Sequence, residues 1–386
     1  MKNEHLISIY LFFTRIIFGI LRFYKIERKT VFLSTFGDNA YFIAKKLAQS
    51  SNHKMIFINK SRCKIDFHAL PAGDIKIYTF ETLNVWDHLY SLYHLATAKY
   101  VFIDNYVGIL AAIRFKEQVK CIQLWHAAGA IKRFGWSEPA TKERSKNAQL
   151  RFQRVYDQFQ YMPVGCFQMA HIFSEAFHLE PKRFLYTGVP QTDFYFDKKE
   201  MELSLQRVRR AFPEITGKKI VLYAPTFRKS TGNPPDINGL ADKLDGRFLL
   251  MVRMHPSVPA SAAQWEHPCI LNASLYPHVN ELLAAADILI TDYSSLAVEF
   301  SLLRKKMIFF TYDLESYIKE QGLWAESDLY FPGPIVKTTS DLFQHIIDPH
   351  IDFEKIEQFN DRWNTFSKGR SSHNLILKIY HHDDLY

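Results

Sequence analysis

The chain of 386 residues is 47% hydrophobic and 23% charged, which is the balance of a folded globular protein. Its length is that of two ordinary domains rather than one. The formal net charge of +8 favours an anionic partner, and without an RNP, zinc-finger or helix-turn-helix signature nucleic acid is not expected.

The first segment, residues 5–24 (HLISIYLFFTRIIFGILRFY), is apolar except for a few cations. A signal peptide needs an uninterrupted apolar run, and a central arginine is costly in a spanning helix, so Arg15 argues against both. On a helix the cations fall on one side: Arg15, Arg22 and Lys25. Most apolar residues cover the other side, although Leu11 and Phe18 do not. We therefore expect residues 1–28 to form an amphipathic helix in the membrane interface; packing on the protein's own core and a true span are the alternatives.

From residue 30 onward, short β-rich apolar runs alternate with helical patterns, which predicts parallel sheets with crossover helices. In the first series we expect strands at 30–36, 54–58, 75–78, 100–103, 121–125 and 184–187. In the second series we expect strands at 219–224, 248–254, 288–291 and 307–311. The two series predict an α/β protein of two Rossmann-like domains, 29–200 and 201–386, with a cleft between them.

Five polar clusters follow expected strands, and in open α/β sheets ligands bind outside the carboxyl ends of the strands. The first cluster contains His126 and is followed by small residues. Histidine titrates near neutral pH, so His126 is able to accept a proton from a hydroxyl nucleophile. The alternative is a histidine that is hydrogen-bonded inside the fold.

Two clusters of the second series have the chemistry of phosphate binding. Arg253 and His255 leave one strand two residues apart and both can donate to phosphate oxygens; the alternative is a salt-bridged strand end. Asp292, Ser294 and Ser295 lie where a strand turns into a helix. A serine there is a candidate N-cap, and the helix N-terminus favours a phosphate; the alternative is capping alone.

The remaining two clusters have less specific chemistry. Thr226 and Arg228 follow the first strand of the second series, so Arg228 lies either at a diphosphate or on the loop. Asp313 and Glu315 follow the last strand, where carboxylates either hold ribose hydroxyls or cap the next helix.

The signatures of several other enzyme classes are missing from the sequence. There is no Walker A, GxSxG, HExxH, GxGxxG or DxD motif, and the four cysteines form no CxxC pair. This favours phosphate handling by Arg, His, Ser and a helix dipole. A divalent metal is optional, and no metal-binding motif or other cofactor is predicted.

Taken in order, these clusters resemble the CDP-glycerol glycerophosphotransferase family. The runs that carry the resemblance are WHAAGAIKRFG, YAPTFR, RMHPSV, ADILITDYSSLAVEFSLLRKKMIFFTYDLESY and NDRWNTFSKGRSSHNL. The similarity extends from about residue 30 to 377 and looks closest to short members that add the first glycerol phosphate unit. One departure is WHAAG, where many members read WHGT, so Ala127 replaces a glycine beside His126.

The resemblance implies a GT-B-like architecture with an N-terminal acceptor domain and a C-terminal domain that binds CDP-glycerol. It implies transfer of glycerol phosphate from CDP-glycerol to an undecaprenyl-diphosphate-linked ManNAc-GlcNAc disaccharide, with release of CMP, in wall teichoic acid linkage-unit synthesis. It also implies peripheral attachment to the cytoplasmic face of the cell membrane, where the N-terminal helix would meet an anionic surface.

Under this resemblance, three of the motif residues take catalytic roles. His126 is expected to be the general base on the acceptor hydroxyl, and His255 is expected to stabilise the diphosphate with Arg253. Asp292 is expected to orient His255 or the donor glycerol.

The other candidates bind the phosphates of the donor. Charge builds on the phosphoryl oxygens during transfer, so cations and N–H donors should supply most of the stabilisation. Ser294 and Ser295 are expected to hold the phosphate as CMP departs, and Arg228 and Thr226 are further candidates for that task.

Three other functions remain open from the sequence. One is a later glycerol-phosphate-adding enzyme or polymerase of the same family, and another is a GT-B glycosyltransferase with a different nucleotide donor. The third is a non-catalytic membrane-bound scaffold, but the grouping of His, Arg and Ser at successive strand ends speaks against it.

Overall fold

The computed structural model describes residues 2–50, 53–71, 75–82, 84–228, 235–255, 258, 265, 267–324 and 331–380. These residues divide into two compact units. Unit 1 contains the described parts of Met1–His126, Phe134–Asp193 and Phe366–Tyr386, and unit 2 contains those of Ala127–Arg133 and Phe194–Thr365. The expected domains were 29–200 and 201–386. Compared with them, unit 1 also contains the N-terminal helix and the described residues after 365, and unit 2 also contains 127–133 and 194–200.

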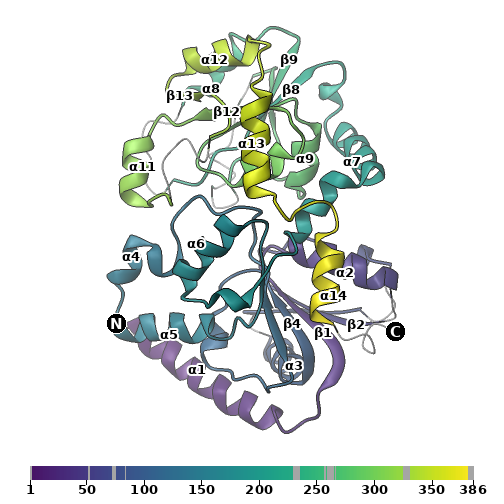
Figure 1. Ribbon diagram of the computed structural model, residues 1–386, viewed down its shortest axis with the longest axis vertical. Helices are drawn as coiled ribbons and strands as arrows, with labels where there is room; N and C mark the ends of the chain where they lie inside the picture. Colours follow the sequence, from purple (N-terminus) through teal and green to yellow (C-terminus); the bar gives the residue numbers. More distant parts are fainter. Residues whose placement is uncertain are drawn as a thin grey trace. The chain divides into compact units, whose positions relative to one another are not determined.

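Unit 1 is built on a five-stranded sheet in which every strand pair is parallel. The strands are β1 (Glu27–Ser34), β2 (Lys54–Asn59), β3 (Ile75–Thr79), β4 (Ala98–Ile103) and β5 (Lys120–Gln123). Their order is β3-β2-β1-β4-β5, which is the Rossmann order. Figure 1 shows β4, β1 and β2 side by side in this sheet. Five of the six strands expected in the first series are thereby confirmed.

The sixth expected strand, at 184–187, is not part of this sheet. β7 (Phe184–Leu185) pairs only with β6 (Met162–Pro163), in a separate two-stranded sheet. The apolar run is short and ends at Gly188, which has a φ of +87° and packs so closely on Phe366 that a Cβ would clash. A buried two-residue strand gives the same local sequence pattern as a strand of the main sheet.

The core of unit 1 is aromatic and includes the C-terminal helix. Phe32 stacks between Phe57 and Phe102, with ring centroids 5.0 and 5.3 Å away. The helices around the sheet are α2 (Asp38–Ser50), α3 (Val85–Thr97), α4 (Pro139–Lys142), α5 (Lys146–Tyr156), α6 (Phe167–Phe177) and α14 (Ser371–Ile379). Figure 1 shows α14 beside α2, and Leu375 and Ile379 are buried in the same hydrophobic cluster as Phe32. The chain therefore returns to unit 1 at its C-terminal end.

The N-terminal helix α1 (Lys2–Leu21) has one narrow buried stripe. The stripe consists of Leu11, Thr14 and Phe18, and α1 contacts α3 and the 3-10 turn η2 (Gly108–Ala111). Leu11 and Phe18 thus lie on the cationic side because that side packs on unit 1. Most other large apolar side chains of α1 are exposed: Leu6, Ile7, Ile9, Tyr10, Phe12, Phe13, Ile16 and Ile20. By length and composition, Glu4–Leu21 is also long and apolar enough to cross a membrane.

Unit 2 is built on a second parallel sheet, of six strands. The strands are β8 (Lys219–Tyr223), β9 (Phe248–Val252), β10 (Ile270–Asn272), β11 (Ile288–Thr291), β12 (Lys306–Phe310) and β13 (Ile335–Val336). The helices are α7 (Lys198–Ala211), α8 (Ile237–Ala241), α9 (Val279–Ala285), α10 (Leu296–Ser301), α11 (Leu314–Glu320), α12 (Thr339–Ile347) and α13 (Phe353–Trp363). All four strands expected in the second series are confirmed, and the order β10-β9-β8-β11-β12-β13 is again the Rossmann order.

The two sheets share one topological feature that positions ligands. The strand order reverses between β1 and β4 in unit 1 and between β8 and β11 in unit 2. Open α/β sheets bind ligands outside the carboxyl ends of the strands at such a switch point. A ligand site is therefore expected at the loops after these four strands.

Candidate functional site

The turn before His126 is fixed by two hydrogen bonds to the backbone of Trp125. After β5, Trp125 adopts a φ of +60°, which is uncommon for a bulky residue. Its N–H donates to Oε1 of Gln123 at 2.9 Å, and its carbonyl accepts from Nδ2 of Asn39 at 3.0 Å. Such backbone conformations persist only where the surroundings determine them, and they cluster at functional sites.

The imidazole of His126 lies between two aromatic rings of unit 1. Its ring centroid is 4.7 Å from that of Phe36 and 4.4 Å from that of Trp125. The two rings pack against the imidazole and limit its rotation. A histidine fixed in this way suits proton transfer at a defined position.

The loop that carries Phe36 is wrapped around a buried carboxylate. Asp104 directly follows β4 and is only 2% exposed. Three successive backbone N–H groups donate to it, at 2.7, 2.9 and 2.7 Å: those of Thr35, Phe36 and Gly37. Burial raises the pKa of Asp104, while the three N–H donors act in the opposite direction. The carboxylate thereby fixes the ring against which His126 packs.

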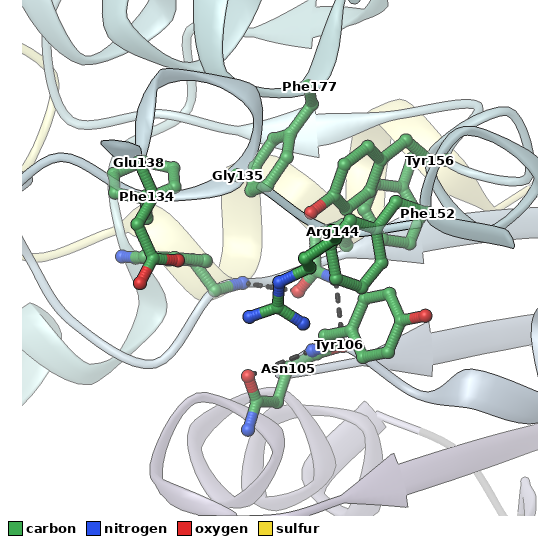
Figure 2. A pocket seen from close by; sticks show the side chains of 12 residues that line it. Asn105, Tyr106, Phe134, Gly135, Glu138, Arg144, Phe152, Tyr156 and Phe177 are labelled. Atoms are coloured by element: carbon green, nitrogen blue, oxygen red, sulfur yellow. Dashed lines mark hydrogen bonds between the residues drawn. The ribbon is translucent and has the colours of Figure 1, made fainter. Parts of the chain in front are cut away.

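A pocket of about 300 Å³ lies beside this turn within unit 1 (Figure 2). Its polar lining includes Asn105 and Gln123 at the ends of β4 and β5, together with Glu138 and Arg144. The rest of the lining is mainly aromatic: Tyr106, Trp125, Phe134, Phe152, Tyr156, Phe159 and Phe177. Figure 2 shows Arg144 pointing into the pocket, and its guanidinium lies 4.7 Å from the ring centroid of Phe152. Mostly apolar walls with a few convergent polar groups are typical of a small-molecule site.

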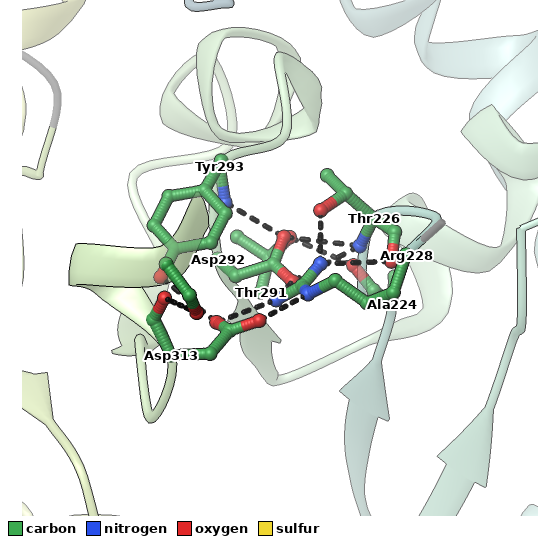
Figure 3. A network of polar contacts seen from close by, with 8 residues as sticks. Ala224, Thr226, Arg228, Thr291, Asp292, Tyr293 and Asp313 are labelled. Carbon is green, nitrogen blue, oxygen red and sulfur yellow. Dashed lines mark hydrogen bonds and ion pairs between the residues drawn. The ribbon is translucent and has the colours of Figure 1, made fainter. Parts of the chain in front are cut away.

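Unit 2 has a corresponding buried carboxylate at its own switch point (Figure 3). Asp292 directly follows β11 and is 1% exposed. Its carboxylate accepts from the N–H groups of Thr226, at 3.0 and 3.1 Å, and Tyr293, at 2.7 Å. These contacts join the loop after β8 to the loop after β11, so they define the shape of this strand end.

Arg228 is engaged by two carboxylates rather than presented to solvent. It pairs with Asp292 at 2.8 Å and with Asp313 at 2.5 Å (Figure 3). Three tyrosine rings surround the guanidinium, with centroids between 4.9 and 5.6 Å away: Tyr293, Tyr312 and Tyr317. Burial acts to lower the pKa of Arg228, but the two carboxylates outweigh it and raise the pKa. The geometry therefore makes Arg228 an organiser of the loops, and a contact with the diphosphate stays a prediction.

A lysine that received no role in the sequence joins this network. The segment 127–133, which directly follows His126, belongs to unit 2. The carbonyl of Ile131 accepts from Trp324 N–H, and Arg133 N–H donates to Gly322, both at 3.1 Å. Between them, Nζ of Lys132 lies 5.8 Å from the ring centroid of Tyr317. Burial lowers the pKa of Lys132 to about 8, and the charge of Asp292 opposes that shift.

The expected phosphate-binding residues of unit 2 differ in their surroundings. Arg253 donates to the carbonyls of Tyr276 and Ala273, so its guanidinium holds the loop after β10. His255 is exposed, and its ring lies 5.8 Å from that of Phe227.

The two expected serines stand where β11 turns into α10. Ser295 is the N-cap residue of α10, but its side chain makes no capping hydrogen bond. Oγ of Ser294 accepts from Leu296 N–H at 3.3 Å instead. Both residues are partly exposed.

The structure brings Thr226, Arg228 and Asp292 together, and it adds Asp313, for which helix capping or ribose binding was expected. Asp313 stands at the N-cap of α11 but makes no side-chain cap; it accepts from Arg228 and from the hydroxyl of Tyr293 at 3.0 Å. Among the described residues no group of three His, Cys, Asp or Glu side chains is arranged to hold a metal ion.

Comparison with known proteins places these features in a family. The family model for CDP-glycerol:poly(glycerophosphate) glycerophosphotransferase matches residues 16–381. The chain is 34% identical to the teichoic acid glycerol-phosphate primase of Bacillus subtilis (strain 168), over 97% of this chain and 98% of that protein. It is 35% identical to the teichoic acid ribitol-phosphate primase of Bacillus spizizenii (strain ATCC 23059 / NRRL B-14472 / W23), over 74% and 76%. Its fold is similar to a structure of the wall teichoic acid polymerase TagF, with a TM-score of 0.79, 21% identity and coverage of 100% and 96%.

Proposed function

Because this chain belongs to the CDP-glycerol:poly(glycerophosphate) glycerophosphotransferase family, we propose that it transfers glycerol phosphate from CDP-glycerol to a lipid-linked disaccharide and releases CMP. The single observation that carries the proposal is the family match across residues 16–381. Similarity to a glycerol-phosphate primase over nearly the full length of both proteins supports the addition of a first unit.

The acceptor in this proposal binds unit 1, in the aromatic pocket beside the His126 turn. Aromatic walls suit the apolar faces of sugar rings, and the amide side chain of Asn105 suits their hydroxyls. Arg144 supplies a fixed cation for a phosphate of the acceptor. His126 then takes the proton of the acceptor hydroxyl as it attacks the β-phosphorus of CDP-glycerol.

The donor in this proposal binds unit 2, at the carboxyl ends of its strands. His255 and Arg253 stabilise the diphosphate, and the hydroxyls of Ser294 and Ser295 hold the phosphate that departs with CMP. The network of Asp292, Thr226 and Arg228 keeps the two loops that border this place in a fixed shape. The interdomain cleft of the family stays a prediction.

Attachment to the membrane is the third part of the proposal. The exposed apolar residues of α1 would enter the acyl boundary of the bilayer on the cytoplasmic face, and its cations would meet anionic headgroups. This placement would bring a lipid-linked acceptor to the enzyme without extracting its lipid from the membrane.

The proposal is tested by measuring CMP release from CDP-glycerol with a soluble analogue of the lipid-linked disaccharide, followed by mass spectrometry of the acceptor. A gain of one glycerol phosphate is the expected product. A ladder of additions would make the protein a polymerase, and no CMP release from folded protein would reject CDP-glycerol as donor.

A second donor, CDP-ribitol, is supported by one observation, the 35% identity to a ribitol-phosphate primase. Competition between CDP-glycerol and CDP-ribitol in the same assay separates the two. We expect CDP-glycerol to have the higher kcat/KM, and a reversed preference would make the protein a ribitol-phosphate transferase.

A further inference from the structure

A second pocket of unit 1, of about 390 Å³, lies between α1, the chain after η2 and the end of α5. Four arginines line it, and they come from three separate parts of the chain: Arg15, Arg22, Arg114 and Arg154. Figure 1 shows α1 running alongside α5, and Glu4 ties the two helices together by accepting from Ser145 at 2.6 Å. Phe18 packs edge-on against Phe115 on the same side of α1, at 6.1 Å between ring centroids. The fold therefore builds this arginine pocket from packed elements.

The four arginines of the pocket outnumber its one acidic lining residue, so the pocket keeps an excess of positive charge. One acidic residue, Asp157, lines the pocket, and its carboxylate accepts from Nε2 of Gln153 at 2.8 Å. No ion pair joins the four guanidinium groups to any described residue. Nε of Arg22 is buried and has no hydrogen-bond partner there. A buried donor without a partner is unfavourable, so the pocket has the chemistry of an anion site.

The position of the arginine pocket on α1 points to the source of that anion. Its walls include Arg15, Gly19 and Arg22, which follow the cationic side of the helix. The opposite side carries the exposed apolar residues Phe12, Phe13, Ile16 and Ile20. In an interfacial helix with this pattern, long arginine side chains extend from the polar side to the level of the lipid phosphates.

We propose that Arg15, Arg22, Arg114 and Arg154 form a binding pocket for a phosphate group carried by a membrane lipid. Guanidinium groups bind phosphate oxygens through paired N–H donors, which suits a phosphomonoester or a diphosphate. The pocket gives α1 a specific headgroup contact in addition to the diffuse attraction of its cations. This inference rests on the membrane attachment within the proposed function.

The first test measures binding of the full chain to phosphatidylcholine vesicles that carry phosphatidic acid. Arg22→Gln is compared with Lys25→Gln, which removes an equal charge at an exposed position just beyond α1. A cation that only feels the surface potential should change binding about fivefold. We expect Arg22→Gln to lose several times more than Lys25→Gln, and Arg154→Gln, which lies on α5, to match it. Equal losses for Arg22→Gln and Lys25→Gln would overturn the proposal.

A second variant blocks the arginine pocket without removing a charge. A Cβ added at Gly19 meets no atom within 4 Å, so Gly19→Leu should be tolerated and should occupy space in the pocket. Leucine adds apolar surface to α1 and would strengthen nonspecific membrane binding. We expect weaker binding to phosphatidic acid vesicles, whereas binding to vesicles in which oleic acid supplies the same surface charge should be stronger. Stronger binding to both kinds of vesicle would contradict a phosphate pocket.

A third measurement separates a lipid phosphate from a soluble one. Inorganic pyrophosphate is titrated into wild type and Arg22→Gln by calorimetry, without vesicles. A binding step that Arg22→Gln removes, without a preference for phosphatidic acid vesicles, would keep the phosphate chemistry and assign a soluble ligand. No such step, together with no preference for phosphatidic acid, would overturn the site. If wild type binds no vesicle at all, the membrane part of the proposed function fails. The pyrophosphate titration then decides whether the arginine pocket binds phosphate.

Discussion

At the scale of single residues, the best-defined feature is the turn at Trp125 and His126. Its φ of +60° is maintained by Gln123 and Asn39, and the imidazole is held between two rings. Strained backbone conformations cluster at functional sites, and a general base needs a fixed direction. The turn thus favours the catalytic interpretation of His126 over a histidine that only completes the core.

We expect His126→Ala to lower turnover by roughly 10²–10⁴-fold, because general-base catalysis contributes about that much. Affinity for CDP-glycerol, measured by calorimetry, should stay near wild type, since His126 lies in unit 1 and the donor is proposed to bind unit 2. His171→Ala serves as the control, because His171 is exposed on α6 of the same unit. Turnover that survives in His126→Ala would remove this residue from the reaction.

Lys132 gives a pH prediction with a definite sign. Burial lowers its pKa from 10.5 to about 8. Between these two values the unfolded chain holds a proton that the folded chain has lost, so Lys132 makes folding more favourable as pH rises through that window. We expect the ¹³Cε resonance of Lys132, assigned by its loss in Lys132→Met, to titrate near pH 8. Because the charge of Asp292 raises this pKa, Asp292→Asn should move the midpoint lower, and a midpoint near 10.5 in wild type would show that Lys132 is solvated.

The sequence identified residues such as His126 and Asp292 because each directly follows an apolar run. The residues that hold them were not identified. Asn39 and Trp125 are 86 positions apart, and Asp104 is 69 positions from Thr35. Asp104 also follows a predicted strand, so its position was a usable signal, but only the strand order shows that it faces the loop after β1.

At the scale of elements, both sheets have the same arrangement at their switch points: a buried aspartate after one strand accepts hydrogen bonds from the loop after the neighbouring strand. Asp104 directly follows β4 and accepts from Thr35, the first residue after β1. Asp292 directly follows β11 and accepts from Thr226, in the loop after β8. The sequence shows no internal repeat, so the likeness lies in topology: a carboxylate beyond the reversal ties down the neighbouring loop. This explains why both loops can present side chains in fixed directions.

In unit 2, Arg228 supplies the positive charge that pairs with the buried Asp292. Removing one partner of a buried ion pair leaves an uncompensated charge, so Arg228→Met should destabilise unit 2 by about 3–5 kcal/mol. The same change at Arg247 is the control, because its pair with Asp245 is exposed and should leave stability nearly unchanged. Denaturant-dependent hydrogen exchange of the β8 and β11 amides measures the effect. Equal protection in the two variants would mean that Arg228 does not organise these loops.

Elements were predictable from the sequence where one local pattern decides them. The central strands are buried runs of β-branched and aromatic residues, and such runs indicate a strand wherever they are bounded by turn residues. α1 was predicted as a helix, but its cationic side also buries Leu11 and Phe18. Periodicity alone does not distinguish a side that faces headgroups from a side that packs on the protein.

At the scale of the whole molecule, the units are not consecutive stretches of chain. The segment 127–133 belongs to unit 2 although residues on both sides of it belong to unit 1. Residues 366–380 belong to unit 1 although unit 2 precedes them. A sequence-based division at a single boundary does not identify these two segments, because their assignment depends on contacts between distant residues. Asp193 makes one such contact: its carboxylate accepts from Ser371 N–H at 2.7 Å and Ser372 N–H at 2.8 Å.

This assignment predicts that the end of the chain stabilises the beginning of the fold. Ile379 is 1% exposed in the core cluster of unit 1, whereas Leu377, on the same helix, is 61% exposed. Ile379→Ala should therefore cost about 2–5 kcal/mol, through lost burial and the cavity that remains, and Leu377→Ala should change stability by less than about 0.5 kcal/mol. Hydrogen exchange locates the effect: β1 and β4 should lose protection in Ile379→Ala, while β8 and β11 keep theirs. If β8 and β11 lost protection instead, α14 would belong to unit 2, as a C-terminal domain of residues 201–386 requires.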